Sequence, residues 1–141
     1  MKKSILFALF MLNACSSGNS DPRIGKAELT KLKRWEAQTN IDANIEIELN
    51  RRNPQTDESF MQIVNETVKR SVEKEKQQIR ALKLEHREVR KIAQLYEEML
   101  TITPELYQAT LTSDKKRVVM LQAKIEQLNQ QSVKLEKQIF Q

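Results

Sequence analysis

Glycine, proline, cysteine and large aromatic side chains are all scarce in this 141-residue sequence. With 2 glycines, the chain has little material for a glycine-rich loop that cradles phosphates, and no phosphate-binding loop, nucleophile elbow or zinc-ligand spacing occurs. Its one cysteine excludes an internal disulfide, and its one histidine has no second His or Cys nearby to complete a zinc site. The sequence therefore predicts no cofactor, no metal ligand and no catalytic residue, and we expect a protein that is not an enzyme.

Charged residues make up 30% of the chain and hydrophobic residues 39%, whereas aromatic residues make up only 5%. Leu, Ile, Lys, Glu and Gln dominate, which is typical of coiled coils and helical bundles. Such a chain buries narrow stripes of Leu, Ile and Val, so its helices must pair along their length. The formal net charge of +5 is a mild excess that argues against a dedicated nucleic-acid binder but allows weak contact with anionic lipid headgroups.

The first twenty residues have the pattern of an export signal. Met1-Lys2-Lys3 is positively charged, and residues 5–12 form an apolar run that is too short to span a membrane. The run ends in Leu12-Asn13-Ala14-Cys15, with Ser16-Ser17 following. This arrangement resembles the lipobox of bacterial lipoproteins, in which a Leu, a small residue and the Cys hold these positions, although Asn13 departs from the usual small or hydroxyl residue. An ordinary secretory signal with a chance cysteine is the alternative.

The resemblance implies that a peptidase cuts between Ala14 and Cys15, that the Cys15 side chain receives a diacylglycerol, and that the new amino group is acylated. Residues 1–14 are then the signal peptide, and residues 15–21 are a short, flexible, lipidated tether. Two or three acyl chains suffice for stable anchoring in a membrane. Because the residues after the cysteine lack the Asp that retains such lipoproteins at the inner membrane, the resemblance further implies the outer membrane, on the face toward the periplasm.

Residues 22–141 have the pattern of a single helical domain. Asp21-Pro22 is a capped helix start with an early proline, and Thr103-Pro104 is a second one. The alternation of apolar and polar residues over 41–49 suits a strand, but no other segment offers a partner strand, so a helix is expected there as well. The predicted helices are residues 23–53, 57–101, 104–111 and 114–140.

The strongest periodicity lies in residues 57–101, where seam residues recur at spacings of 3 and 4 from Val68 to Leu100. The same spacing runs through the last segment, from Val118 to Ile139. Two heptad helices joined by a tight turn pack antiparallel, and the first helix can supply a third. We therefore expect an all-α fold, either an elongated antiparallel helical hairpin or a three-helix bundle with coiled-coil seams. Self-association also stays open, because such a seam buries equally well within one chain or between chains.

Four features invite a functional interpretation. His86 lies in the predicted seam, where a polar residue that sets the register is favoured over a pH sensor or metal ligand. Glu75, in the same seam, either pairs with a base from another helix or marks a wet position, and catalysis would need a second positioned group. Trp35 favours a packing anchor over a binding hot spot, and Lys115-Lys116-Arg117 favours solvated side chains over an anion-facing patch.

The leading hypothesis is a membrane-anchored, non-enzymatic lipoprotein that acts as a helical protein-binding or structural module of the cell envelope, with an envelope protein as its partner. The alternative is a small helical periplasmic chaperone or envelope-stress sensor, which would expose a concave apolar face. A structural lipoprotein joined to the cell wall is a third option, but the chain ends in Ile139-Phe140-Gln141 rather than in the Lys used for that link. A nucleic-acid partner is not expected.

Overall fold

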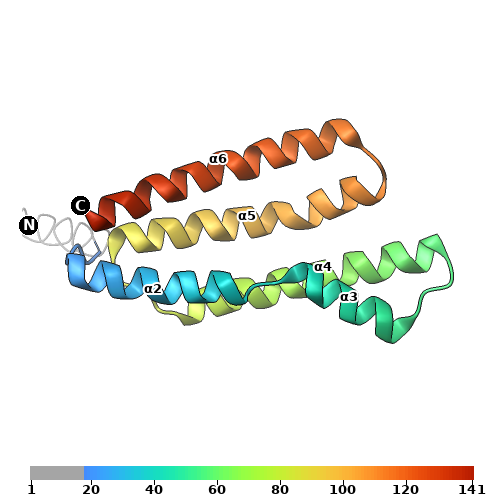
Figure 1. The fold of residues 1–141 in the computed structure, drawn as a ribbon, viewed down its shortest axis with the longest axis horizontal. Helices are drawn as coiled ribbons and strands as arrows, with labels where there is room; N and C mark the ends of the chain where they lie inside the picture. The colour runs from blue at the N-terminus through green and yellow to red at the C-terminus, as the bar shows by residue number, and fades with distance from the viewer. Residues whose placement is uncertain (1–17) are drawn as a thin grey trace, which may run out of the picture.

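The computed structural model describes residues 18–141, which fold into five α-helices in an elongated arrangement (Figure 1). The helices are α2 (Pro22–Gln38), α3 (Ile41–Arg52), α4 (Asp57–Ala81), α5 (Arg87–Leu111) and α6 (Lys115–Phe140). α2 and α3 follow one another along the molecule, and α4, α5 and α6 each reverse the direction of the chain. The expected all-α class is confirmed. The helices pack in a four-helix arrangement, in which α2 and α3 together take the position of the first helix. The expected hairpin or three-helix bundle is wrong.

The fourth helix arises because the long rod predicted for residues 57–101 is folded back on itself. α4 ends at Ala81, and residues 82–86 lead the chain into the antiparallel α5. Lys83 makes this turn in the left-handed backbone conformation, with a φ of 50°. A straight rod would leave its apolar face in water, whereas the turn lets Val72 of α4 and Val89 of α5 join one buried core. The apolar spacing continues across the turn, so the spacing alone predicted a continuous helix.

The other predicted helix boundaries hold in part. The helix predicted for 23–53 is broken at Thr39 and Asn40, where the Asn40 side chain accepts a hydrogen bond from the Ala43 N–H at 2.9 Å and so caps α3. Residues 41–49 are helical, as predicted. The separate helix predicted for 104–111 is wrong, because α5 runs through Pro104 without a break. The final helix matches α6.

The core of the described chain has two parts. The larger cluster draws on α2, α3, α4 and α5 and on the C-terminal end of α6, and it includes Leu32, Val68 and Ile139. The smaller cluster lies between α5 and α6 alone, with Ile102, Ala109, Leu121 and Leu128 as its buried members. One end of the molecule is therefore a four-helix bundle, and from it the α5–α6 hairpin extends as a two-helix arm beside the α3–α4 hairpin (Figure 1).

Candidate functional site

The predicted lipidation site, Cys15, and the predicted cleavage position at Ala14 lie outside the residues that the structure describes. The chain just after them is fixed to the turn between α4 and α5. The Asn19 N–H donates to the Glu85 carbonyl at 3.1 Å, and the Asn19 carbonyl accepts from the Arg87 N–H at 2.7 Å. Gly18, with a φ of 61°, packs so closely that a β-carbon there would lie 3.3 Å from the Arg87 backbone. The tether thus enters the bundle beside residues 85–87.

A buried glutamate holds the same turn from the side of α2. Both carboxylate oxygens of Glu28 accept hydrogen bonds at 2.8 Å, one from the Glu85 N–H and one from the His86 N–H. These donors lie in the turn and at the N-cap just before α5, where an N–H group has no helical carbonyl to which it can donate. Charge-assisted bonds of this kind offset the cost of burying a carboxylate. Glu28, which sequence reasoning missed, is therefore the residue that joins α2 to the tether-binding turn.

His86 occupies this turn rather than a helix seam, so its predicted role in a continuous seam is wrong. It is the N-cap of α5, and its Nδ1 accepts from the Glu88 N–H at 3.3 Å. Its buried ring packs directly on α2, because a β-carbon on Gly25 would lie only 2.8 Å from the His86 Nε2. A polar cap with a flat apolar body fits a position where a helix start meets a second helix.

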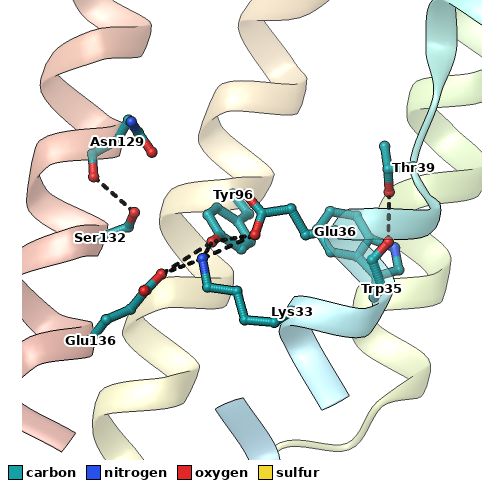
Figure 2. Close-up of polar contacts among 8 residues, drawn as sticks. All are labelled: Lys33, Trp35, Glu36, Thr39, Tyr96, Asn129, Ser132 and Glu136. Atoms are coloured by element: carbon teal, nitrogen blue, oxygen red, sulfur yellow. Dashed lines mark hydrogen bonds and ion pairs between the residues drawn. The ribbon is translucent and has the colours of Figure 1, made fainter. Parts of the chain in front are cut away.

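A second polar cluster joins α2, α5 and α6 at the middle of the bundle (Figure 2). The Lys33 ammonium lies 2.6 Å from the Glu136 carboxylate, 3.0 Å from the Glu36 carboxylate and 3.0 Å from the Tyr96 hydroxyl. The Tyr96 hydroxyl also lies 3.2 Å from Glu36. Burial lowers the pKa of Lys33, but its hydrogen bonds to these partners outweigh burial and raise that pKa above its ordinary value. Burial raises the pKa of Tyr96 to about 12.

These shifts decide what the cluster can do chemically. A lysine held as an ammonium is a poor nucleophile, and a phenol held protonated is a poor base at neutral pH. Lys33 is thus the cation of two ion pairs, and Tyr96 is a hydrogen-bond donor. Together with their carboxylate partners they link α2, α5 and α6. The cluster is a structural clasp, and Lys33, Glu36 and Glu136 were not predicted because nothing in the sequence pairs residues so far apart.

Of the other residues that the sequence singled out, Trp35 and Glu75 lie in the core and residues 115–117 lie on the surface. Trp35 is a buried packing anchor, as predicted, with its ring 5.9 Å from the Tyr96 ring. Glu75 is buried nearby and accepts a hydrogen bond from the Thr39 hydroxyl at 2.9 Å, rather than pairing with a base. Lys115-Lys116-Arg117 is exposed at the start of α6, at the opposite end of the molecule from the tether. The structure therefore gathers no catalytic set from these residues.

Metal binding and membrane spanning are two further possibilities for residues 18–141. No group of three or more His, Cys, Asp or Glu side chains is placed there to hold a metal ion. None of the helices that the structure describes is long and apolar enough to cross a membrane.

The comparisons with known proteins give the class of the protein. Residues 26–141 match the family described as uncharacterised lipoprotein PM1805, and this segment begins after the lipobox-like residues. The chain is thus a helical lipoprotein, which a lipid anchor attaches to a membrane of the cell envelope. It belongs to the family of the uncharacterised lipoprotein PM1805. No curated protein and no solved structure matches it.

Proposed function

We propose that the chain is cut between Ala14 and Cys15, lipidated on Cys15, and held on the periplasmic face of the outer membrane as a non-enzymatic protein-binding module. The observation that carries this proposal is the docking of Asn19 on the turn between α4 and α5. It makes one end of the helical body the anchored end, and it leaves the other end available to a protein partner in the envelope.

The reach of the tether supports this orientation. Cys15 precedes Asn19 by four residues, so an extended chain places them at most about 14 Å apart. The docked end of the body therefore stays close to the lipid headgroups. α5 has 25 residues and α6 has 26, so each extends roughly 38 Å away from that end at about 1.5 Å per residue. The turns at 53–56 and 112–114 are then the parts that meet a partner.

The α5–α6 arm has the surface that such a partner would use. Val119 and Met120, in the first turns of α6, are 66% and 58% exposed. They lie two and three residues after the exposed, positively charged residues 115–117. Exposed apolar side chains bordered by charge are typical of a protein interface. The chaperone alternative is less favoured, because the large exposed hydrophobic residues of α6 are spread along it from Val119 to Phe140, and the others, Ile47 and Phe60, lie on α3 and α4.

The test is a crosslinking pull-down combined with membrane fractionation of intact cells. We expect the native protein in the outer-membrane fraction with one stoichiometric partner. Cys15→Ala, exported behind an ordinary cleavable secretory signal, should be released into the soluble periplasmic fraction by a high-salt wash. Ser17→Ala is the matched control and should behave as the native protein does. A Met120→Ser variant should stay in the membrane and lose the partner. A Cys15→Ala protein that stays with the membrane through the high-salt wash would refute the anchor, and many unrelated clients in place of one partner would favour the chaperone.

A further inference from the structure

We propose that the anchored end of the bundle also binds the membrane surface directly, through three lysines that contact anionic lipid headgroups. These are Lys26, Lys83 and Lys137, and together they form what we term the headgroup face. This inference rests on the proposed attachment of lipid to Cys15, because that attachment holds the docked end within about 14 Å of the bilayer. It adds a second, electrostatic contact with the same membrane.

The three lysines come from three elements that meet where the tether enters. Lys83 lies in the turn to which Asn19 is hydrogen-bonded. Lys26 lies in the first turns of α2, with its Nζ 6.0 Å from the centre of the Phe140 ring. Phe140 is the last residue of α6, and Lys137 is in the last turn of that helix. Figure 1 shows the start of α2 and the end of α6 side by side at this end.

The charges of these lysines are available to an outside partner. All three side chains are exposed, and none takes part in an ion pair within residues 18–141. The acidic groups beside them are mostly engaged, with the exception of Glu85, which is exposed in the same turn as Lys83. Glu28 accepts two backbone N–H groups, and the carboxylate of Asp21 pairs with Arg23 at 3.3 Å. The face therefore keeps a net positive charge, which is complementary to lipid phosphates.

Two further features suit a lipid surface better than open solvent. Lys83 holds a left-handed φ of 50°, at the position after a helix where glycine is the usual residue. A lysine there costs backbone strain, and such strain concentrates at functional positions. Phe140 is 64% exposed beside Lys26, and an aromatic ring flanked by cations is typical of protein surfaces that lie at the headgroup level.

The experiment measures vesicle binding by the chain that starts at residue 15 and carries Cys15→Ala, so that no acyl chain contributes. We expect it to sediment with vesicles of phosphatidylcholine and phosphatidylglycerol, to be released by salt, and to ignore pure phosphatidylcholine. Replacing Lys26, Lys83 and Lys137 together by Gln should weaken binding about fivefold per lysine, or of the order of 100-fold in all. Because no lipid is attached, a failure here concerns the headgroup face alone, whereas fractionation of the native protein tests the anchor.

Two variants make the result decisive. The matched control replaces Lys115, Lys116 and Lys124 by Gln; it removes the same charge from the opposite end and should leave binding nearly unchanged. Lys83→Gly relieves the left-handed strain, so it should keep or raise the melting temperature while weakening binding about fivefold. Equal losses from the two triple variants would mean long-range attraction without a defined face. Binding to cell-wall sacculi in place of vesicles would also overturn the proposal.

Discussion

Lys33 and Tyr96 illustrate how single residues are set by partners that are distant in the sequence. The two side chains share Glu36 and Glu136, so the ammonium and the phenol are each held in the protonated form (Figure 2). Their pKa values are both raised, Lys33 chiefly because its hydrogen bonds outweigh burial and Tyr96 chiefly because of burial. Each group therefore contributes stability in full below its unfolded pKa and loses that contribution as the pH rises through its folded pKa.

Both tyrosines of the chain should titrate late in the folded protein. Burial raises the pKa of Tyr96 to about 12, and burial with the Asp42 hydrogen bond raises that of Tyr107. In a Tyr107→Phe variant, phenolate absorbance should appear near pH 12, whereas in denaturant it should appear near the ordinary value of about 10. The free energy of unfolding should fall between these two pH values.

A second substitution separates the causes of the Tyr96 shift. The hydrogen bond from the Lys33 ammonium lowers the Tyr96 pKa, in opposition to burial. Lys33→Met in the Tyr107→Phe background should therefore move the phenolate midpoint to still higher pH. A midpoint near 10 in a chain that keeps its helical circular dichroism would contradict the buried position of Tyr96.

For single residues, the burial of an apolar side chain could be predicted from the sequence, but the hydrogen-bond partner of a polar one could not. Trp35 was correctly expected to pack in the core, because its large apolar ring lies on the same predicted helix as other apolar residues and is best buried with them. Glu28 and Gly25 gave no sequence signal, since their role depends on the turn at residues 85–86 that lies against them. His86 was misplaced for the same reason: a seam residue and an N-cap fit the same apolar spacing.

Among the helices, α5 contains the clearest local conflict. It runs from Arg87 to Leu111 through Pro104, which has no N–H to donate to the Leu100 carbonyl. Pro104→Ala restores this bond and removes the clash of the ring with the preceding turn. We expect a gain of about 1–3 kcal/mol in the free energy of unfolding, measured in urea.

The control for this change is Glu105→Ala on the same turn. It removes only the exposed pair with Arg117, at 2.8 Å, and should cost less than about 1 kcal/mol. If Pro104→Ala left stability unchanged or lowered it, the helix would already accommodate the proline without loss, and some other contact of its ring would have to be stabilising.

Capping residues and prolines predicted some helix ends correctly, but Thr103-Pro104 predicted a start that lies inside α5, and Asn40, which caps α3, was not recognised as a cap. Asp114 caps α6 at the expected position, through a 3.1 Å bond from the Arg117 N–H. The break at Thr39 and the turn at Lys83 contain neither glycine nor proline, so no helix-breaking residue marks these two positions in the sequence. Both interruptions arise where burial of long apolar faces outweighs local helix preference.

For the molecule as a whole, composition decided the class and left the topology open. Few glycines and many Leu, Glu, Lys and Gln predicted the all-α class. The family match supports the lipoprotein class that the lipobox-like residues 12–15 predicted. The predicted number of packed helices was wrong, because a heptad seam shows which face of a helix is buried but not which other helix packs against that face. That choice is made by contacts such as those of Lys33 with Glu136, which only the folded chain brings together.

The two parts of the core should differ in stability, and this can be measured. Leu32 is fully buried in the four-helix part, so Leu32→Ala should cost about 2–5 kcal/mol and speed amide hydrogen exchange in all helices. Leu121 lies in the two-helix arm, where the neighbouring helices can collapse onto the space that is left. Leu121→Ala should therefore cost roughly the lower end of that range and speed exchange only near residues 102–128. Faster exchange in α2 as well would show that the arm and the bundle unfold as one unit, and a partner bound to the arm would then be linked to the stability of the anchored end.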